Sequence, residues 1–135
     1  MKSEVFLDTN IILYGIDSNL EKSKIAHKLV SGNPCISTQV INEFANVLLR
    51  KYKWLPKEVA STINEISERL SIIIVTEKTA IAATTLLEEY YFSWWDSLMV
   101  AAALEANCKI LYSEDMQHNQ VINNVLTIKN PFLKL

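Results

Sequence analysis

Four acidic residues lie where short apolar runs of the chain end, or shortly beyond them. They are Asp8, Glu43, Asp96 and Asp115. Aspartate is scarce, with only four among the fifteen acidic residues, and three of those four hold these positions. In open parallel α/β sheets the functional crevice lies outside the carboxyl ends of the strands, so acids at successive strand ends can converge. The placement therefore predicts one acidic site built from distant parts of the sequence.

The chemistry that such acids favour is hydrolysis of a phosphodiester with the help of a divalent metal. Carboxylates alone would repel the phosphate, but three or four of them can hold one or two Mg²⁺ or Mn²⁺ ions through oxygen ligands. Two ions about 4 Å apart can activate the attacking water and stabilise the leaving oxygen. The two histidines, His27 and His118, have no histidine partner nearby in sequence, so they are expected to be solvated or structural.

Each acid alone also has a structural interpretation. Asp8 fits the cap of a helix that begins at Thr9, and Asp96, three residues after Ser93, fits the third position of a capping box. Glu43 could flank an apolar helical face, and Asp115 could belong to a turn. The neighbouring Glu114 could also replace Asp115 as the functional acid. The joint placement of the four acids favours the functional interpretation.

Apolar strand-like runs alternate with segments of helical periodicity along the whole chain. This pattern predicts an α/β fold with right-handed crossovers and a mostly parallel sheet of roughly five strands, flanked by helices, in a single domain over residues 1–135. The β-branched run at 72–75 is expected to be central in the sheet or covered. The strands are expected at 5–7, 35–37, 72–75, 109–112 and 125–128, and the helices from 9, at 21–30 and 38–52, from 56, and at 79–90 and 94–106.

Composition narrows the classes of ligand and of cellular location that fit the chain. A formal charge of −2 gives no overall attraction to nucleic acid, and two glycines provide no glycine-rich phosphate loop, so no nucleotide cofactor is expected. Cys35 and Cys108 each begin an apolar run and are expected to be buried, reduced thiols rather than zinc ligands. The chain lacks an apolar run of about 20 residues and its start is too acidic for a signal peptide, which predicts a cytoplasmic protein without a membrane segment.

Four segments together resemble the PIN-domain nucleases, and more closely the VapC-type ribonuclease toxins of prokaryotic toxin–antitoxin modules. The resemblance implies a PIN-like three-layer sandwich and a Mg²⁺- or Mn²⁺-dependent endoribonuclease that leaves a 5′-phosphate on the downstream product. It also implies a cognate antitoxin that blocks the acids with a helix or an extended tail, and a homodimer. The segments that carry it are residues 6–14, 37–44, 95–104 and 110–116.

The same resemblance assigns roles to single residues. Asp8, Glu43 and Asp96 would be the principal metal ligands, and Asp115 the fourth acid, contributing to a second ion. Hydroxyl groups would orient an acid or a water, and these belong to Thr9 and to Ser113, where the family often has threonine. Asn10 would contact substrate or a ligand carboxylate.

Two surfaces are expected to serve the partners. Basic residues near one helix end, Arg50, Lys51 and Lys53 with Lys57 nearby, are candidates for contact with the RNA backbone. Aromatic residues are candidates for the protein interfaces, namely Tyr14, Trp54, Tyr91 and Phe92.

Two other functions fit part of the pattern. A phosphatase of the haloacid-dehalogenase type could use Asp8 as a phosphorylated nucleophile, but it would need an acid two residues later, where this chain has Asn10. A PIN-like domain could also act only as a binding or scaffold module. The retained acids favour the enzyme.

Overall fold

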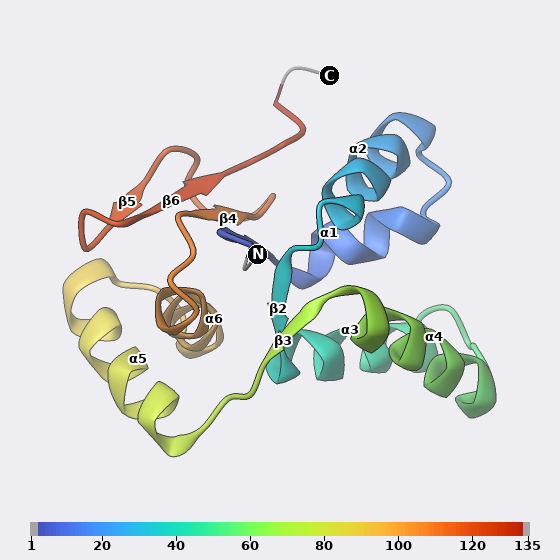
Figure 1. The fold of residues 1–135 in the computed structure, drawn as a ribbon, viewed down its shortest axis with the longest axis horizontal. Helices are drawn as coiled ribbons and strands as arrows, with labels where there is room; N and C mark the ends of the chain where they lie inside the picture. Colours follow the sequence, from blue (N-terminus) through green and yellow to red (C-terminus); the bar gives the residue numbers. More distant parts are fainter. Residues whose placement is uncertain (1–2, 134–135) are drawn as a thin grey trace.

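A mostly parallel sheet forms the centre of the computed structural model, which describes residues 3–133 (Figure 1). Within these residues the sheet has six strands in the order β3-β2-β1-β4-β6-β5, and only β5 runs antiparallel to its neighbour. The strands are β1 (Val5–Leu7), β2 (Cys35–Ser37), β3 (Ser71–Ile73), β4 (Ile110–Tyr112), β5 (Val121–Ile122) and β6 (Leu126–Lys129).

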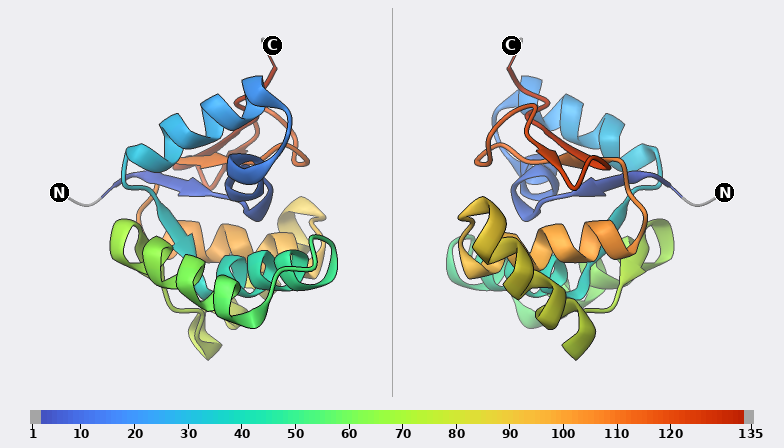
Figure 2. Two further views of the ribbon diagram at one scale, coloured as in Figure 1. Left: turned by 90° about the vertical axis from the view of Figure 1, so that its right-hand side faces the viewer. Right: turned by 90° about the vertical axis from the view of Figure 1, so that its left-hand side faces the viewer.

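Helices cover both faces of the sheet, as Figures 1 and 2 show. The connections from β1 to β2 and from β2 to β3 step in one direction, so right-handed crossovers place their helices on one face. The connection from β3 to β4 steps back across the sheet and places α5 and α6 on the other face. The helices are α1 (Thr9–Leu13), the 3₁₀ turn η1 (Tyr14–Ile16), α2 (Leu20–Ser31), α3 (Thr38–Arg50), α4 (Pro56–Arg69), α5 (Glu77–Tyr90) and α6 (Trp94–Glu105).

The predicted α/β sandwich is confirmed, with two corrections at the edges of the sheet. The expected five strands are six, because the two-residue strand β5 pairs with β6 through a turn containing Asn123 and Asn124, both at positive φ. Asparagine tolerates that conformation. The other correction concerns β3, which was expected to be central in the sheet or covered. It lies at the edge of the sheet, so it is not central, and its residues are half-buried. Its β-branched residues favour an extended backbone, but they do not indicate where in the sheet the strand lies.

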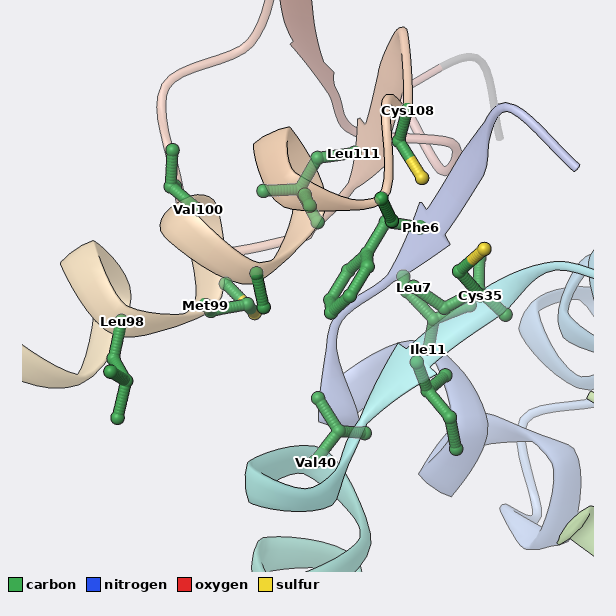
Figure 3. Close-up of a cluster of buried hydrophobic side chains, with 14 of the residues drawn as sticks. Phe6, Leu7, Ile11, Cys35, Val40, Leu98, Met99, Val100, Cys108 and Leu111 are labelled. Atoms are coloured by element: carbon green, nitrogen blue, oxygen red, sulfur yellow. The ribbon is translucent and has the colours of Figure 1, made fainter. Parts of the chain in front are cut away.

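The core fixes strand β1 from both sides (Figure 3). Phe6 and Leu7 are fully buried, and their side chains point to opposite faces, as alternation along a strand requires. Phe6 lies against Met99 of α6, whereas Leu7 lies beside Cys35 and Ile11. Because both faces of β1 are packed, the residue that follows the strand, Asp8, has a defined position at the carboxyl ends of the strands.

Cys35 and Cys108 are both buried, as predicted. Within residues 3–133, no helix combines the length and the apolar character that crossing a membrane requires.

Candidate active site

Asp8 is the most constrained of the acids. Its carboxylate caps α1 by accepting a hydrogen bond from the Thr9 N–H at 2.6 Å, and it accepts a second from Ser113 Oγ at 2.9 Å. Ser113 is in reach because β1 and β4 are parallel neighbours, with Leu7 opposite Tyr112. The helix-cap interpretation of Asp8 is therefore confirmed, and the cap places the carboxylate at the carboxyl edge of the sheet.

Burial raises the pKa of Asp8 to about 6. The hydrogen bonds from Ser113 and Thr9 act in the opposite direction, and the negative charges of Asp96 and Glu43 add to the rise. Three carboxylates from β1, α3 and α6 thus share one electrostatic neighbourhood. Burial, with a smaller contribution from the neighbouring charges, makes the ionised state of Asp8 costly unless a cation compensates it.

Glu43 reaches this neighbourhood from the second turn of α3. That helix starts directly after β2, where the buried Ser37 caps it by accepting a hydrogen bond from the Val40 N–H at 3.3 Å. Glu43 Oε1 accepts a hydrogen bond from Thr9 Oγ1 at 2.8 Å. Thr9 and Ser113 therefore each bind one of the acids, Glu43 and Asp8 respectively.

Asp96 and Asp115 complete the acidic group. Asp96 lies in the first turn of α6, where its N–H donates to Ser93 Oγ at 3.1 Å, so its helix-start interpretation is also confirmed. Burial raises the pKa of Asp96, the bond with Ser93 lowers it, and the charge of Asp115 raises it. Asp115 itself is exposed and accepts a hydrogen bond from the Asn10 amide. Asn10 thus contacts an acid of the group.

Glu114, the alternative to Asp115, forms an ion pair with a lysine. Its carboxylate accepts hydrogen bonds from Tyr14 Oη and from Lys22 Nζ, both at 2.5 Å. Burial alone would raise the pKa of Glu114, but the bonds and charge of Lys22 and Tyr14 outweigh it and lower that pKa. The Lys22 ammonium also lies over the rings of Tyr14, at 4.7 Å, and Phe132, at 5.2 Å. Glu114 already has its cation, and it anchors the segment that carries Ser113 and Asp115.

A sequence model of the PIN domain matches residues 5–123, which include all four acids. The chain belongs to the PIN domain family. This membership removes the phosphatase alternative. The comparison with curated proteins gives no significant match.

Solved structures with the same fold include a toxin–antitoxin complex and a loop-cleaving toxin. A toxin–antitoxin complex from Klebsiella pneumoniae is similar at a TM-score of 0.72 and 19% identity, over 95% of this chain and 98% of that chain. VapC20 of Mycobacterium tuberculosis, a sarcin–ricin loop cleaving toxin, gives 0.66 and 20%, over 82% and 89%. VapBC2 from Rickettsia felis, bound to a DNA fragment from its promoter, gives 0.64 and 25%, over 93% and 97%.

The remaining candidates of this PIN domain lie outside the acidic group. His27 is exposed and its Nε2 lies 2.9 Å from the Gly15 carbonyl oxygen, while His118 Nδ1 accepts a hydrogen bond from the Asn130 N–H at 3.0 Å. Both have the solvated or structural roles that were predicted.

The basic and aromatic candidates differ in how exposed their side chains are. Arg50, Lys51 and Lys53 are exposed, and of these Lys51 lines a hollow of about 160 Å³ together with Asn10 and Glu114. Of the four aromatic candidates, only Tyr91 is largely exposed, at 91%. The others are half-buried and pack against the core, and these are Tyr14, Trp54 and Phe92.

Sequence reasoning missed the partners of Glu114. Lys22 and Tyr14 bind its carboxylate from positions far away in the sequence, and nothing in their local pattern distinguishes them from a helix-surface lysine or a core aromatic. Ser93 was not missed, since its place three residues before Asp96 predicted the helix start, and its Oγ accepts the Asp96 N–H.

The donor chemistry of the site suits a hard divalent cation. Among residues 3–133, Asp8, Glu43, Asp96 and Asp115 have no ion pair, and their direct partners are hydroxyl, amide and backbone groups. Within the same residues, no three acidic, histidine or cysteine side chains already stand in a metal-binding arrangement. A cation such as Mg²⁺ or Mn²⁺ would have to draw the oxygen ligands together through changes in side-chain rotamers.

Proposed function

We propose that this PIN domain is a metal-dependent endoribonuclease and acts as the toxin of a toxin–antitoxin pair. The observation that carries the proposal is the grouping of Asp8 with Glu43 and Asp96 at the carboxyl ends of the strands. Burial raises the pKa of Asp8 to about 6, the charges of Glu43 and Asp96 add to the rise, and no basic side chain within residues 3–133 forms an ion pair with it. Such an arrangement destabilises the fold unless binding compensates for it, and perturbed groups of this kind cluster at functional sites.

In this proposal Asp8, Glu43, Asp96 and Asp115 hold one or two Mg²⁺ or Mn²⁺ ions. A bound ion supplies charge neutralisation at the phosphodiester and lowers the pKa of the attacking water. Thr9 and Ser113 keep Glu43 and Asp8 in fixed orientations through their hydrogen bonds. Asn10 does the same for Asp115, which would otherwise be a freely rotating exposed side chain.

RNA is the proposed substrate. The similar Mycobacterium tuberculosis protein is named as a sarcin–ricin loop cleaving toxin, which supports RNA over other phosphodiesters. Lys51 lines the hollow beside Asn10 and would contact the RNA backbone there. Arg50 and Lys53, which are exposed at the same end of α3, would add attraction at longer range.

The proposed partner is a cognate antitoxin, and the proposed assembly is a homodimer. The Klebsiella structure that shares the fold is named as a toxin–antitoxin complex, which supports an antitoxin partner. An antitoxin segment that covers the acidic group would inhibit the enzyme by excluding RNA and metal. Tyr91, almost fully exposed at the end of α5, is the best aromatic candidate for a protein interface.

The test is cleavage of a structured RNA pool by the purified, antitoxin-free protein with Mg²⁺, Mn²⁺ or EDTA. The Asp96→Asn variant serves as the matched control, and the new RNA ends are mapped. We expect metal-dependent cuts that leave 5′-phosphates and that disappear in the variant. A folded protein that neither cuts RNA nor binds metal would instead support the scaffold function.

A further inference from the structure

A second, larger hollow adjoins the acidic group on the surface between α3 and α6. Its volume is about 550 Å³, and its lining includes Gln39, Asn42, Glu43 and Asn46 of α3 and Trp95 of α6. We refer to it as the α3–α6 hollow. Glu43 belongs both to this lining and to the acidic group, so a molecule in the hollow would touch the proposed reaction site.

The α3 side of the hollow presents side-chain amides in a row. Gln39, Asn42 and Asn46 follow a spacing of three and four residues, which places them on one face of the helix. Asn42 and Asn46 are exposed, and within residues 3–133 neither side chain makes a hydrogen bond. Each amide offers both donors and an acceptor, a combination that matches the edges of nucleobases.

The α6 side of the hollow presents an aromatic surface. Trp95 is 60% exposed although the next residue, Asp96, is half-buried. Gln39 Nε2 donates to the Trp95 carbonyl oxygen at 3.0 Å and so fixes the backbone from which the indole projects. Gln39 Oε1 is buried and lacks a hydrogen-bond partner among the described residues. An exposed tryptophan on a fixed backbone is suited to stacking against a planar ring.

We propose that the α3–α6 hollow binds one base of single-stranded RNA next to the scissile phosphate. The base would stack on Trp95, and Asn42 and Asn46 would read its hydrogen-bonding edge, as single-stranded RNA is commonly recognised. The inference rests on the proposed function, because only a nucleic-acid substrate joins a base in the hollow to a phosphate at the acids. No lysine or arginine is part of this lining within residues 3–133, so the hollow suits a base better than the backbone.

The test compares single-turnover RNA cleavage by the full-length wild type and three variants, Trp95→Ala, Trp95→Phe and Trp94→Ala. Trp94 is the matched control, since it is the adjacent exposed tryptophan, at 36%, and is not part of the lining. We expect Trp95→Ala to raise the half-saturating RNA concentration about 5- to 100-fold, the range that loss of one base stack produces. Trp95→Phe should restore most of the affinity, and Trp94→Ala should match the wild type.

A second readout tests recognition of the base edge. Asn42→Ala and Asn46→Ala should relax the base preference at one position beside the cut, as mapped by sequencing the new ends, while Mg²⁺ binding is unchanged. Both asparagines are exposed and unbonded, so thermal melting should confirm that the variants fold. An unaltered preference in both variants would overturn the reading role of the amides.

The outcomes separate this inference from the proposed function. If the wild type cuts RNA and Trp95→Ala behaves like Trp94→Ala, the subsite is wrong and the nuclease stands. If the wild type does not cut, anisotropy with a short fluorescent single-stranded oligoribonucleotide in Ca²⁺ decides, since binding lost only in Trp95→Ala supports the subsite without the nuclease. If Trp95→Ala changes the oligomeric mass by light scattering while RNA affinity is unchanged, the hollow is a protein interface and the inference is overturned.

Discussion

Asp8 and Glu114 follow neighbouring parallel strands, β1 and β4, yet their carboxylates meet different surroundings. Asp8 accepts hydrogen bonds from Ser113 and the Thr9 N–H, faces two further acids, and has its pKa raised to about 6 by burial. Glu114 is also penalised by burial, but Lys22 and Tyr14 bind it and lower its pKa. The carboxyl ends of two neighbouring strands therefore carry one acid without a basic partner, Asp8, and one acid paired with a lysine, Glu114.

This difference separates acids that stabilise the fold from acids that could bind a metal ion. An acid whose charge is already compensated contributes to folding and gains little from a metal ion. An acid that is buried beside other acids is strained when ionised, so a divalent cation would stabilise it most. Substitutions of Asp8 and of Glu114 should therefore have different effects.

The largest difference is expected in catalysis. Asp8→Asn should lower RNA cleavage about 100- to 1,000-fold, the usual cost of removing one electrostatic element of an active site. It should not lower the melting temperature of the metal-free protein, because the variant removes an uncompensated buried charge and keeps the shape of the side chain. Initial rates of cleavage and thermal melting by circular dichroism measure the two effects.

Glu114→Gln is the matched control for that variant. It should lower the melting temperature, since Lys22 loses its partner, while cleavage should fall about tenfold or less, because Glu114 acts only through the position of its segment. If Glu114→Gln abolished cleavage and Asp8→Asn did not, the assignment of the two acids would have to be exchanged.

Metal binding should stabilise the protein through the uncompensated acids. Mg²⁺ or Mn²⁺ at 100 times its dissociation constant should add about 2.7 kcal/mol to the free energy of unfolding of the wild type. The effect should be larger at pH 7.5 than at pH 5, because protonation of Asp8 competes with the ion. Asp8→Asn and Asp96→Asn should each remove most of it, whereas Glu114→Gln should keep it. Denaturant unfolding with and without metal measures these differences, and an equal response at both pH values would argue against carboxylate ligands.

Without metal, the two acids should give opposite dependences of stability on pH. The pKa of Asp8 rises from 3.8 to about 6 on folding, so its contribution is fully present below about pH 4 and is lost as the pH rises through 6. The loss should be on the order of 3 kcal/mol. Glu114 has a lowered pKa, so its contribution is present above the ordinary value of 4.5 and is lost as the pH falls below it.

Denaturant unfolding between pH 3 and pH 8 resolves the two contributions when each variant is compared with the wild type. Asp8→Asn should reduce the fall between pH 4 and pH 6, although Asp96, whose pKa is also raised, retains part of it. Glu114→Gln should reduce the rise at the acidic end. An unchanged profile in Asp8→Asn would mean that Asp8 does not carry the burial cost assigned to it.

The sequence predicted the parts of this site that local pattern determines. An apolar run followed by Asp8 and a helix start predicted both the strand and the cap, and parallel strands then require Asp8 and Ser113 to meet at one edge. The same reasoning brought Glu43 and Asp96 to that edge. The fold class and most element bounds followed from the alternation of strands and helices.

Contacts between distant residues could not be predicted in this way. Glu114 and Asp115 are adjacent in the sequence, and only their partners, Lys22 with Tyr14 for one and Asn10 for the other, separate their roles. Strand β5 is too short for a periodic signal, and it depends on pairing with β6. Position at the edge of the sheet, as for β3, is likewise a property of the topology and not of the local residues.

The smallest effect is expected from Lys22, which acts on the site through Glu114. Lys22→Met keeps much of the aliphatic packing against Tyr14 and Phe132 but removes the ammonium, so Glu114 becomes a partly buried acid without its cation. The melting temperature should fall, and cleavage should fall about tenfold or less because Ser113 and Asp115 lose a fixed support. A double-mutant cycle with Glu114→Gln tests the coupling, since the two changes in unfolding free energy should be clearly less than additive. Additive effects would show that Lys22 and Glu114 act independently, and Glu114 would then return as a candidate for the fourth metal-binding acid.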